Sequence, residues 1–218
     1  MVVTEIFKSI QGESTYAGRP CIFVRLTGCN LRCRWCDTAY AFYGGTRMTV
    51  DEVMAQVREL TGTDGARIPL VELTGGEPML QPDIHPLIEK LLAENHTVLI
   101  ETSGERYLGE LPRAVVKVMD IKCPGSGEGG SLNDKNLEVL DLKDEIKFVI
   151  ADEGDYFWAR DFTRQRRLGD IVGTVIFSPV HGELDPKALS EWILRDALPV
   201  RLGLQLHKFI WGPDVKGV

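Results

Sequence analysis

The sequence predicts an α/β fold: a partial, open β/α barrel of the TIM type, built on a mostly parallel sheet. Along the 218 residues, short runs rich in β-branched side chains alternate with amphipathic segments of helical period. Repeated βα units of this kind form parallel sheets. Only seven strand candidates fit between residues 21 and 206, whereas a closed eight-stranded barrel takes about 250 residues. We therefore expect an open barrel in a single domain over residues 1–218.

The expected elements alternate in chain order. The first strand covers residues 21–26, and the first helix, 49–60, begins with a capping box of Thr49 and Glu52. The further strands are expected at 70–73, 97–101, 115–121, 145–150, 172–177 and 202–206, and the further helices at 83–94, 155–166 and 186–195.

Polar motifs follow the expected strands at their carboxyl ends, where folds of this class bind ligands. One such motif is explained by ordinary turn chemistry, but six are not, so we expect a shared site at this end of the sheet. The motifs are Thr27 to Cys36, Thr74 to Pro78, Thr102 to Gly104, Lys122, Ser178 and His207.

Charge and hydropathy exclude two classes of partner. The net charge of −7 argues against binding to nucleic acid, which needs a cationic face. The basic cluster Arg164, Arg166 and Arg167 is interpreted as the solvated face of a helix. No stretch approaches the roughly 18 apolar residues of a membrane helix, and no signal-peptide pattern begins the chain. We expect a cytoplasmic protein with a small-molecule substrate and no membrane association.

Three of the five cysteines lie together in the spacing C-x3-C-x2-C, at Cys29, Cys33 and Cys36. Thiolates so spaced suit an iron-sulfur cluster or zinc, and a full ligand set is normally four. One metal position is therefore left for another ligand, which in a structural zinc site would be a distant histidine. Of the other two cysteines, Cys21 is expected in the core and Cys123 is ambiguous.

This motif resembles the one that defines the radical S-adenosylmethionine (SAM) superfamily, including the aromatic residue before the last cysteine, here Trp35. The resemblance implies that Cys29, Cys33 and Cys36 hold a 4Fe-4S cluster whose fourth iron is chelated by SAM. In that superfamily an electron from the cluster cleaves SAM to methionine and a 5′-deoxyadenosyl radical. The protein positions the cofactor, which carries the difficult chemistry.

The turn Thr74-Gly75-Gly76-Glu77-Pro78 resembles the superfamily segment that holds the SAM amino group. Its two glycines allow close approach of backbone and ligand, and we expect them to expose amide groups. Lys122 at a strand end is able to meet a carboxylate, with a surface lysine as the alternative. The SAM contacts implied by the resemblance are Trp35, Cys36, Asp37, Gly76, Glu77, Ser103, Asp120, Lys122, Ser178, Val180 and His181.

Further segments closely resemble the 7-carboxy-7-deazaguanine synthase family over nearly the whole chain, from Glu5 to Pro213. They are Glu5 to Glu13, Gly18 to Pro20, Phe23 to Arg25, Cys36 to Thr38 and Gln205 to Lys208. That family contracts 6-carboxy-5,6,7,8-tetrahydropterin to 7-carboxy-7-deazaguanine with loss of ammonia, a step toward queuosine and other 7-deazapurines. The resemblance implies hydrogen abstraction from C6, rearrangement and return of hydrogen with SAM regenerated. It divides the domain into a substrate-binding segment 4–20, a cluster loop 27–38 and a closing segment 205–218.

A flat, anionic heterocycle needs a cationic anchor, hydrogen bonds along its edge and a face to pack on. Arg25 is the expected clamp for the carboxylate, with pairing to a glutamate on the strand face as the alternative. Thr38 matches the family position whose hydroxyl reaches Mg²⁺, an ion that prefers oxygen ligands. No protein acid or base is assigned. The implied substrate contacts are Ile10, Gln11, Gly12, Glu13, Arg25, Thr74, His207 and Pro213.

The chain departs from the family pattern at two places. Ser14 stands where many relatives have glycine, and residues 214–218 continue past Pro213, where some relatives end, so the Pro213 contact is in doubt. His85 and His96 are expected at the surface.

The resemblance implies a homodimer and an electron donor such as flavodoxin or ferredoxin. Three other interpretations compete with this one. The chain could be a glycyl-radical activating enzyme, which would need a protein partner. The other two are a zinc-binding structural module and an electron carrier.

Overall fold

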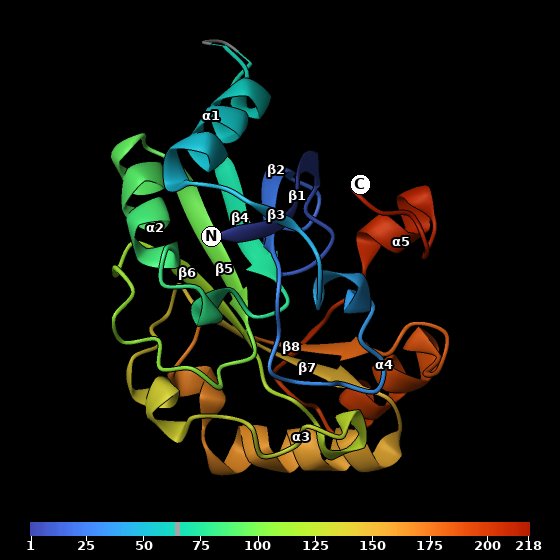
Figure 1. Cartoon of the computed structure of the whole chain (residues 1–218). Helices are drawn as coiled ribbons and strands as arrows, with labels where there is room; N and C mark the ends of the chain where they lie inside the picture. Colours follow the sequence, from blue (N-terminus) through green and yellow to red (C-terminus); the bar gives the residue numbers. More distant parts are fainter. Residues whose placement is uncertain (64–65) are drawn as a thin grey trace.

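A single sheet of nine strands organises the computed structural model, which describes residues 1–63 and 66–218 (Figure 1). The order is β3-β1-β2-β4-β5-β6-β7-β8-β9, so β3 and β9 lie at opposite edges and the barrel is open. All pairs from β2 to β9 are parallel, while β1 is antiparallel to β2 and β3. The strands are β1 (Val2–Ile10), β2 (Pro20–Leu26), β3 (Thr46–Arg47), β4 (Leu70–Gly75), β5 (Thr97–Thr102), β6 (Val116–Asp120), β7 (Glu145–Ile150), β8 (Thr174–Pro179) and β9 (Arg201–Leu202).

The predicted fold class is confirmed, and the helices follow the predicted alternation. Thr49 caps the first helix through the expected capping box with Glu52. The helices are α1 (Val50–Thr61), α2 (Ile84–Ala93), α3 (Glu153–Gln165), α4 (Pro186–Arg195) and α5 (Leu206–Trp211), with 3-10 turns at Ala39–Ala41, Pro78–Leu80, Pro124–Ser126, Asp134–Glu138 and Leu168–Asp170.

Two ends of the sheet differ from the prediction. β1 and β3 were not expected, and the strand predicted at 202–206 is wrong because the sheet ends at Leu202. The Gly203 amide still donates to the Phe177 carbonyl, at 2.9 Å, but a side chain at Gly203 would clash with Ile176 and Ser178. The chain then leaves the sheet and forms α5.

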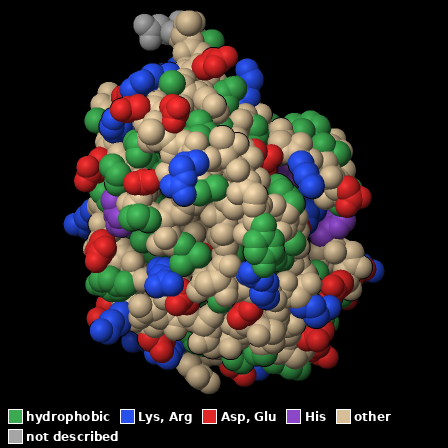
Figure 2. All heavy atoms as spheres, viewed as in Figure 1, with side chains coloured by type: hydrophobic (Ala, Val, Ile, Leu, Met, Phe, Trp, Pro, Cys, Tyr) green, Lys and Arg blue, Asp and Glu red, His purple; other side chains and the backbone are tan. Residues whose placement is uncertain are grey.

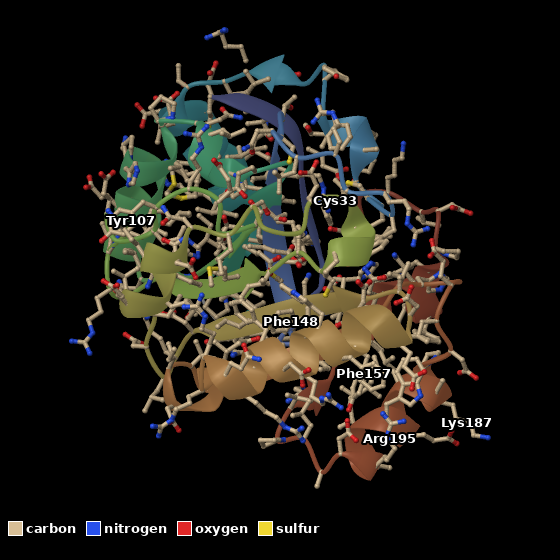
Figure 3. The ribbon with its side chains drawn as sticks, turned by 90° about the horizontal axis from the view of Figure 1, so that it is seen from below. Cys33, Tyr107, Phe148, Phe157, Lys187 and Arg195 are labelled. Atoms are coloured by element: carbon tan, nitrogen blue, oxygen red, sulfur yellow. The ribbon has the colours of Figure 1, made fainter. Side chains whose placement is uncertain are left out.

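The main core lies between the sheet and its covering helices, where α1 and α2 pack over one half and α3 and α4 over the other (Figure 1). Phe148 of β7 meets Trp158 and Phe162 of α3 edge-on, with ring centroids 6.1 Å apart in both pairs, and it lies between the sheet and α3 in Figure 3. Each fully buried side chain of this size contributes about 1.5–3 kcal/mol. Helix packing therefore holds the open barrel in shape.

The strands turn alternate side chains into the barrel, where two layers differ in character. Along β4, Val71 and Leu73 face the helices, while Leu70 joins a second apolar cluster inside the barrel. That cluster comprises Cys21, Phe23, Leu70, Leu99 and Val116, with Phe7 and Tyr16 packed against it. Toward the carboxyl ends of the strands, the side chains that face the barrel interior are polar and are able to bind a ligand.

Several single-residue predictions are decided by burial. Cys21 is in the core as expected, and Cys123 is buried too. His96 is not at the surface as predicted: it is buried, its Nδ1 lies 3.3 Å from the Pro69 carbonyl, and burial lowers its pKa. The turn from α2 into β5 places His96 just before the first residue of β5, Thr97.

The outer surface agrees with the charge analysis. Arg164, Arg166 and Arg167 are exposed, as predicted. Acidic and basic side chains are interspersed over the face shown in Figure 2, without a continuous basic patch on that face. Within residues 1–63 and 66–218, no helix is both long and apolar enough to cross a membrane.

Candidate active site

A pocket of about 630 Å³ opens at the carboxyl ends of the parallel strands. Its wall combines side chains from the 11–14 segment, the cluster loop, the ends of β2 and β4 to β8, and α5 with the segment after it. The loop-borne motifs that the sequence places after separate strands therefore meet in one cavity, as expected for this topology.

The three clustered cysteines line this pocket together. Cys36 donates its backbone N–H to the Cys33 carbonyl, at 3.2 Å, and the Leu31 N–H points at the Cys29 sulfur, at 3.4 Å. Burial raises the pKa of each thiol, that of Cys33 to about 11, while the Lys122 ammonium opposes the rise. A cation beside the three thiols is the electrostatic setting that thiolate ligands need.

Three thiols with one metal position left open suit a cluster better than a closed structural zinc site, which has four protein ligands. Sulfurs around one tetrahedral zinc are about 3.8 Å apart, given a Zn–S bond of about 2.3 Å. In the described part of the chain, no group of three or more His, Cys, Asp or Glu side chains could hold one metal ion. Thiolates of a 4Fe-4S cluster each bind a different iron and are set wider. The donor set therefore fits the cluster and weakens the zinc alternative.

The glycine turn after β4 packs directly on the start of the cluster loop. The Gly76 N–H donates to Leu26 O at 3.1 Å and the Glu77 N–H to Gly28 O at 2.8 Å. The expectation that the glycines expose their amides is therefore wrong at Gly76, while a contact of Gly76 with SAM stays a prediction. A side chain on Gly75 or Gly76 would collide with the Leu26 or Gly28 backbone. The glycines thus permit two loops to touch.

Glu77 is fully buried and joins the turn after β4 to the end of β5. Its carboxylate accepts hydrogen bonds from the Ser103 N–H and Oγ at 2.8 and 2.7 Å, from Thr102 Oγ1 at 2.8 Å, and from the Met79 N–H at 3.0 Å. The Glu77 carboxylate therefore positions the β4 and β5 loops. Direct contacts of Glu77 and Ser103 with SAM stay predictions.

Asp120 supplies an acceptor that lacks a protein partner. Its Oδ2 pairs with Lys122 Nζ at 2.9 Å, while its buried Oδ1 has no hydrogen-bond partner among the described residues. A buried acceptor without a partner is costly, so a ligand donor is expected there. SAM carries hydroxyl and amino donors, which suit this position. Val180 and His181 line the pocket just after β8. Ser178 of β8 is buried beside Gly203 and is not among the residues that line the pocket, so its contact with SAM stays a prediction.

The predicted substrate residues meet in the same cavity. Ile10, Gln11, Gly12, Glu13, Arg25, Thr74, His207 and Pro213 all line it. Gly12 lies so close to His207 that a side chain at position 12 would collide with the imidazole, and the Leu206 N–H donates to Gly12 O at 2.9 Å. Burial lowers the pKa of His207, despite the nearby Glu13 carboxylate. The predicted substrate-binding segment and the predicted closing segment, which are far apart in the sequence, therefore form one wall of the pocket together.

Arg25 makes the glutamate pairing that was the alternative prediction, while its role as a carboxylate clamp stays a prediction. Its Nε donates to Glu5 Oε1 at 2.8 Å, and Tyr40 Oη donates to the same oxygen at 2.7 Å. The arginine side chain also lines the pocket. The glutamate pairing therefore orients the guanidinium at the cavity wall. Thr38 lies nearby, with its hydroxyl donating to Asp37 Oδ1 at 3.0 Å.

Asp37 links the cluster loop to the closing segment. Its Oδ2 accepts from Lys208 Nζ at 2.9 Å and from Gln205 Nε2 at 3.0 Å. Trp35, on the same loop, lines the pocket and lies under the Arg34 guanidinium, 4.9 Å from the ring centroid.

Comparisons with known proteins agree with this geometry. Residues 23–122 match the Radical SAM superfamily. A curated 7-carboxy-7-deazaguanine synthase from Koribacter versatilis is 54% identical over 100% of both chains. The chain belongs to the 7-carboxy-7-deazaguanine synthase family. Another member, from Chlorobaculum tepidum, is 45% identical over 99% of this chain and 96% of its own. The crystal structure of QueE from Escherichia coli shares the fold, with a TM-score of 0.76 at 22% identity over 94% of each chain.

Membership of the deazaguanine synthase family implies a 4Fe-4S cluster and SAM as cofactors. It also confirms the family to which the cysteine, glycine and N-terminal motifs pointed. The glycyl-radical activating enzyme, zinc module and electron carrier interpretations are set aside.

Three charged residues, which together are called the pocket floor, line the cavity and were missed by the sequence analysis: Glu72, Glu101 and Lys147. Lys147 of β7 pairs with Glu13 Oε2 at 2.8 Å, with Glu101 Oε1 and, at 3.6 Å, with Asp120 Oδ2. Burial alone would lower the pKa of Lys147, but the carboxylates outweigh it and raise the pKa well above its usual range. The available signal was a charged residue among the apolar residues of an expected strand, as at Glu72 and Lys147.

Proposed function

We propose that this protein contracts 6-carboxy-5,6,7,8-tetrahydropterin to 7-carboxy-7-deazaguanine with loss of ammonia, as a radical SAM lyase of 7-deazapurine and queuosine biosynthesis. One observation carries the proposal: the three cluster thiols and the segment 10–13 with Arg25 line a single pocket. A reaction started at a cofactor needs its substrate within reach of the same cavity. When bound, the cluster supplies the electron that cleaves SAM.

The residues of the pocket have distinct tasks in this proposal. Arg25, held by Glu5, would clamp the substrate carboxylate. The 10–13 segment and Thr74 would bind the polar edge of the ring, and Phe7 and Phe23, stacked with centroids 5.0 Å apart, offer an apolar wall. The predicted segments 4–20, 27–38 and 205–218 keep their proposed substrate-binding, cluster-binding and closing roles. His207 and Pro213 belong to the last of these.

The test is anaerobic incubation of the reconstituted protein with SAM, dithionite and 6-carboxytetrahydropterin, followed by mass spectrometry. Formation of 7-carboxy-7-deazaguanine is the expected result. Cleavage of SAM without this product would keep the radical chemistry and refute the proposed substrate.

Arg25→Lys is expected to raise KM for the pterin while leaving SAM cleavage without substrate unchanged. Lysine keeps the charge but loses the planar fork that binds a carboxylate through two parallel bonds. Losing one charged hydrogen bond costs about 1.5–3 kcal/mol, or about 10- to 150-fold in KM. Glu5→Gln is the control for the structural role of the pair: if it raises KM as much as Arg25→Lys, the direct clamp is contradicted.

We also propose that Thr38 contributes its hydroxyl to a Mg²⁺ ion completed by substrate oxygen and water. Mg²⁺ keeps several waters and binds through few protein oxygens, so one hydroxyl at the pocket wall is compatible with such a site. Product formation is expected to fall on chelation and to return with Mg²⁺ in the wild type. Thr38→Val should lose this Mg²⁺ response; an unchanged response in Thr38→Val would contradict the assignment.

The proposed partners follow from family and surface. An electron donor such as flavodoxin or ferredoxin is proposed, because the cluster must be reduced before it is able to cleave SAM. Exposed apolar side chains on and after α5, at Phe209, Ile210 and Val215, favour self-association, in line with a homodimer.

The free thiols favour the reducing cytoplasm. No nucleic-acid partner is proposed, since the net charge is −7.

A further inference from the structure

Glu72 is a buried carboxyl group on the pocket floor to which the proposed reaction gives no task. It lies in the middle of β4, is 3% exposed, and pairs in register with Phe23 of β2 and Leu99 of β5. Its Oε2 accepts a hydrogen bond from Gln11 Nε2. A carboxyl at such a position needs a reason, because acidic side chains are almost never fully buried without a partner.

The charges around Glu72 are unbalanced toward the negative. Glu13 reaches the floor from the 11–14 segment and Glu101 from β5, and both bond Lys147 of β7. The ion pairs of Lys147 among the described residues go to Glu13, Glu101 and Asp120, and none goes to Glu72. Burial, with Glu101 and Glu13, raises the pKa of Glu72 well above its usual range. These surroundings favour the protonated, uncharged form of the Glu72 carboxyl group.

The contact with Glu72 fixes which way the Gln11 carboxamide points. Its Nε2 faces Glu72, and its Oε1 accepts the Glu13 N–H at 2.5 Å. The Gln11 backbone is held as well, because its N–H donates to Arg19 O and its carbonyl accepts from the Gly18 N–H, each at 2.8 Å. The Gln11 side chain therefore connects Glu72 on β4 to the backbone N–H of Glu13.

We propose that Glu72 is a positioning residue: as an uncharged carboxylic acid it holds Gln11, and through Gln11 the 10–13 segment, in the shape that binds the polar edge of the heterocyclic substrate. This inference rests on the proposed function for the identity of that substrate. The neutral state matters because a third carboxylate beside Glu13 and Glu101 would compete for Lys147 and draw Glu13 out of place.

The test compares Glu72→Gln with Glu72→Leu. Glutamine is neutral and still accepts from Gln11, so kcat and KM should stay at wild-type values. Leucine removes the acceptor and leaves the Gln11 N–H buried without a partner, so KM for the pterin should rise about 5- to 150-fold. SAM cleavage without substrate should be unchanged in both variants. A Glu72→Gln variant as impaired as Glu72→Leu, or a Glu72→Leu variant with normal KM, would overturn the proposal.

Glu145→Leu is the matched control, since Glu145 is equally buried and also holds the 11–19 segment. Its carboxylate accepts the Thr15 N–H at 3.1 Å, but Glu145 does not line the pocket. We expect lower thermal stability in this variant with KM unchanged. An equal rise of KM in Glu145→Leu would mean that general loosening of the segment, and not Glu72, sets KM.

The protonation state is measured independently of turnover by infrared difference spectroscopy between the wild type and Glu72→Gln at neutral pH. A carboxylic-acid carbonyl band present in the wild type and missing in Glu72→Gln is expected, and its absence overturns the proposal even if Glu72→Leu does not fold. If the wild type cleaves SAM without making the deazaguanine, the proposed function fails, while this band still decides the state of Glu72.

Discussion

Cys33→Ala is expected to abolish product formation and SAM cleavage, because it removes one of the three thiols that the cluster loop offers. With two thiolates left, neither the cluster nor an iron open to SAM is held. The reconstituted variant should lack the brown iron-sulfur absorption, and its SAM cleavage should fall to the background of the assay. Iron and sulfide content, absorption spectra and 5′-deoxyadenosine release are the measurements.

Cys21→Ala is the matched control for Cys33→Ala. Cys21 is fully buried on β2 and does not line the pocket. The variant should therefore keep its cluster and lose about 1 kcal/mol of stability, the usual effect of a single substitution. Loss of the cluster in both variants would point to a general folding defect. SAM cleavage at the wild-type rate by Cys33→Ala would refute the cluster assignment.

Lys147→Met is expected to destabilise the protein by about 3–5 kcal/mol, as does removal of one partner of a buried ion pair. The Lys147 side chain is 5% exposed, and its ammonium is shared by Glu13, Glu101 and Asp120. Methionine is unbranched and keeps most of the length of the side chain, but it leaves these carboxylates without their cation. Urea unfolding of the two proteins measures the free-energy difference.

Lys187→Met provides the comparison on the surface. Lys187 is 79% exposed, 3.9 Å from Glu191 on α4, and points to solvent in Figure 3. Exposed pairs contribute about 0–1 kcal/mol, so this variant should unfold close to the wild type. Equal, small losses in Lys147→Met and Lys187→Met would show that the floor cluster adds nothing to stability.

The parallel part of the fold could be predicted because its strands are short runs rich in β-branched residues, separated by amphipathic segments of helical period. The run from residue 145 to 150 and the helix 186–195 have the predicted bounds. β1 escaped prediction because its sequence, Val-Val-Thr-Glu-Ile-Phe-Lys-Ser-Ile, mixes polar and apolar residues without clean alternation. The segment 202–206 misled because Leu-Gly-Leu-Gln-Leu alternates as a strand does, while tertiary packing at Gly203 ends the sheet.

The site could be predicted where local motifs carry it. Spacing marks Cys29, Cys33 and Cys36, and the strand ends mark Thr74 and Lys122, all of which line the pocket. The floor network could not be predicted in its connections, because Glu13, Glu101 and Lys147 lie on separate elements and only the tertiary fold brings them together. The hydrogen bonds of Glu77 could not be predicted either, because its partners Thr102 and Ser103 lie at the end of the neighbouring strand β5.

The closure of the pocket wall by Gly12 and Leu206 has a consequence for the order of folding. Gln205 reaches Glu13 across 192 residues of sequence, and contacts of such separation form late because the loop between them must first be ordered. Strands β2 to β8 pair with neighbours close in the chain and are able to assemble earlier. During synthesis, the barrel would therefore emerge as a scaffold before its binding cavity exists, and catalytic competence would be the last property that the growing chain acquires.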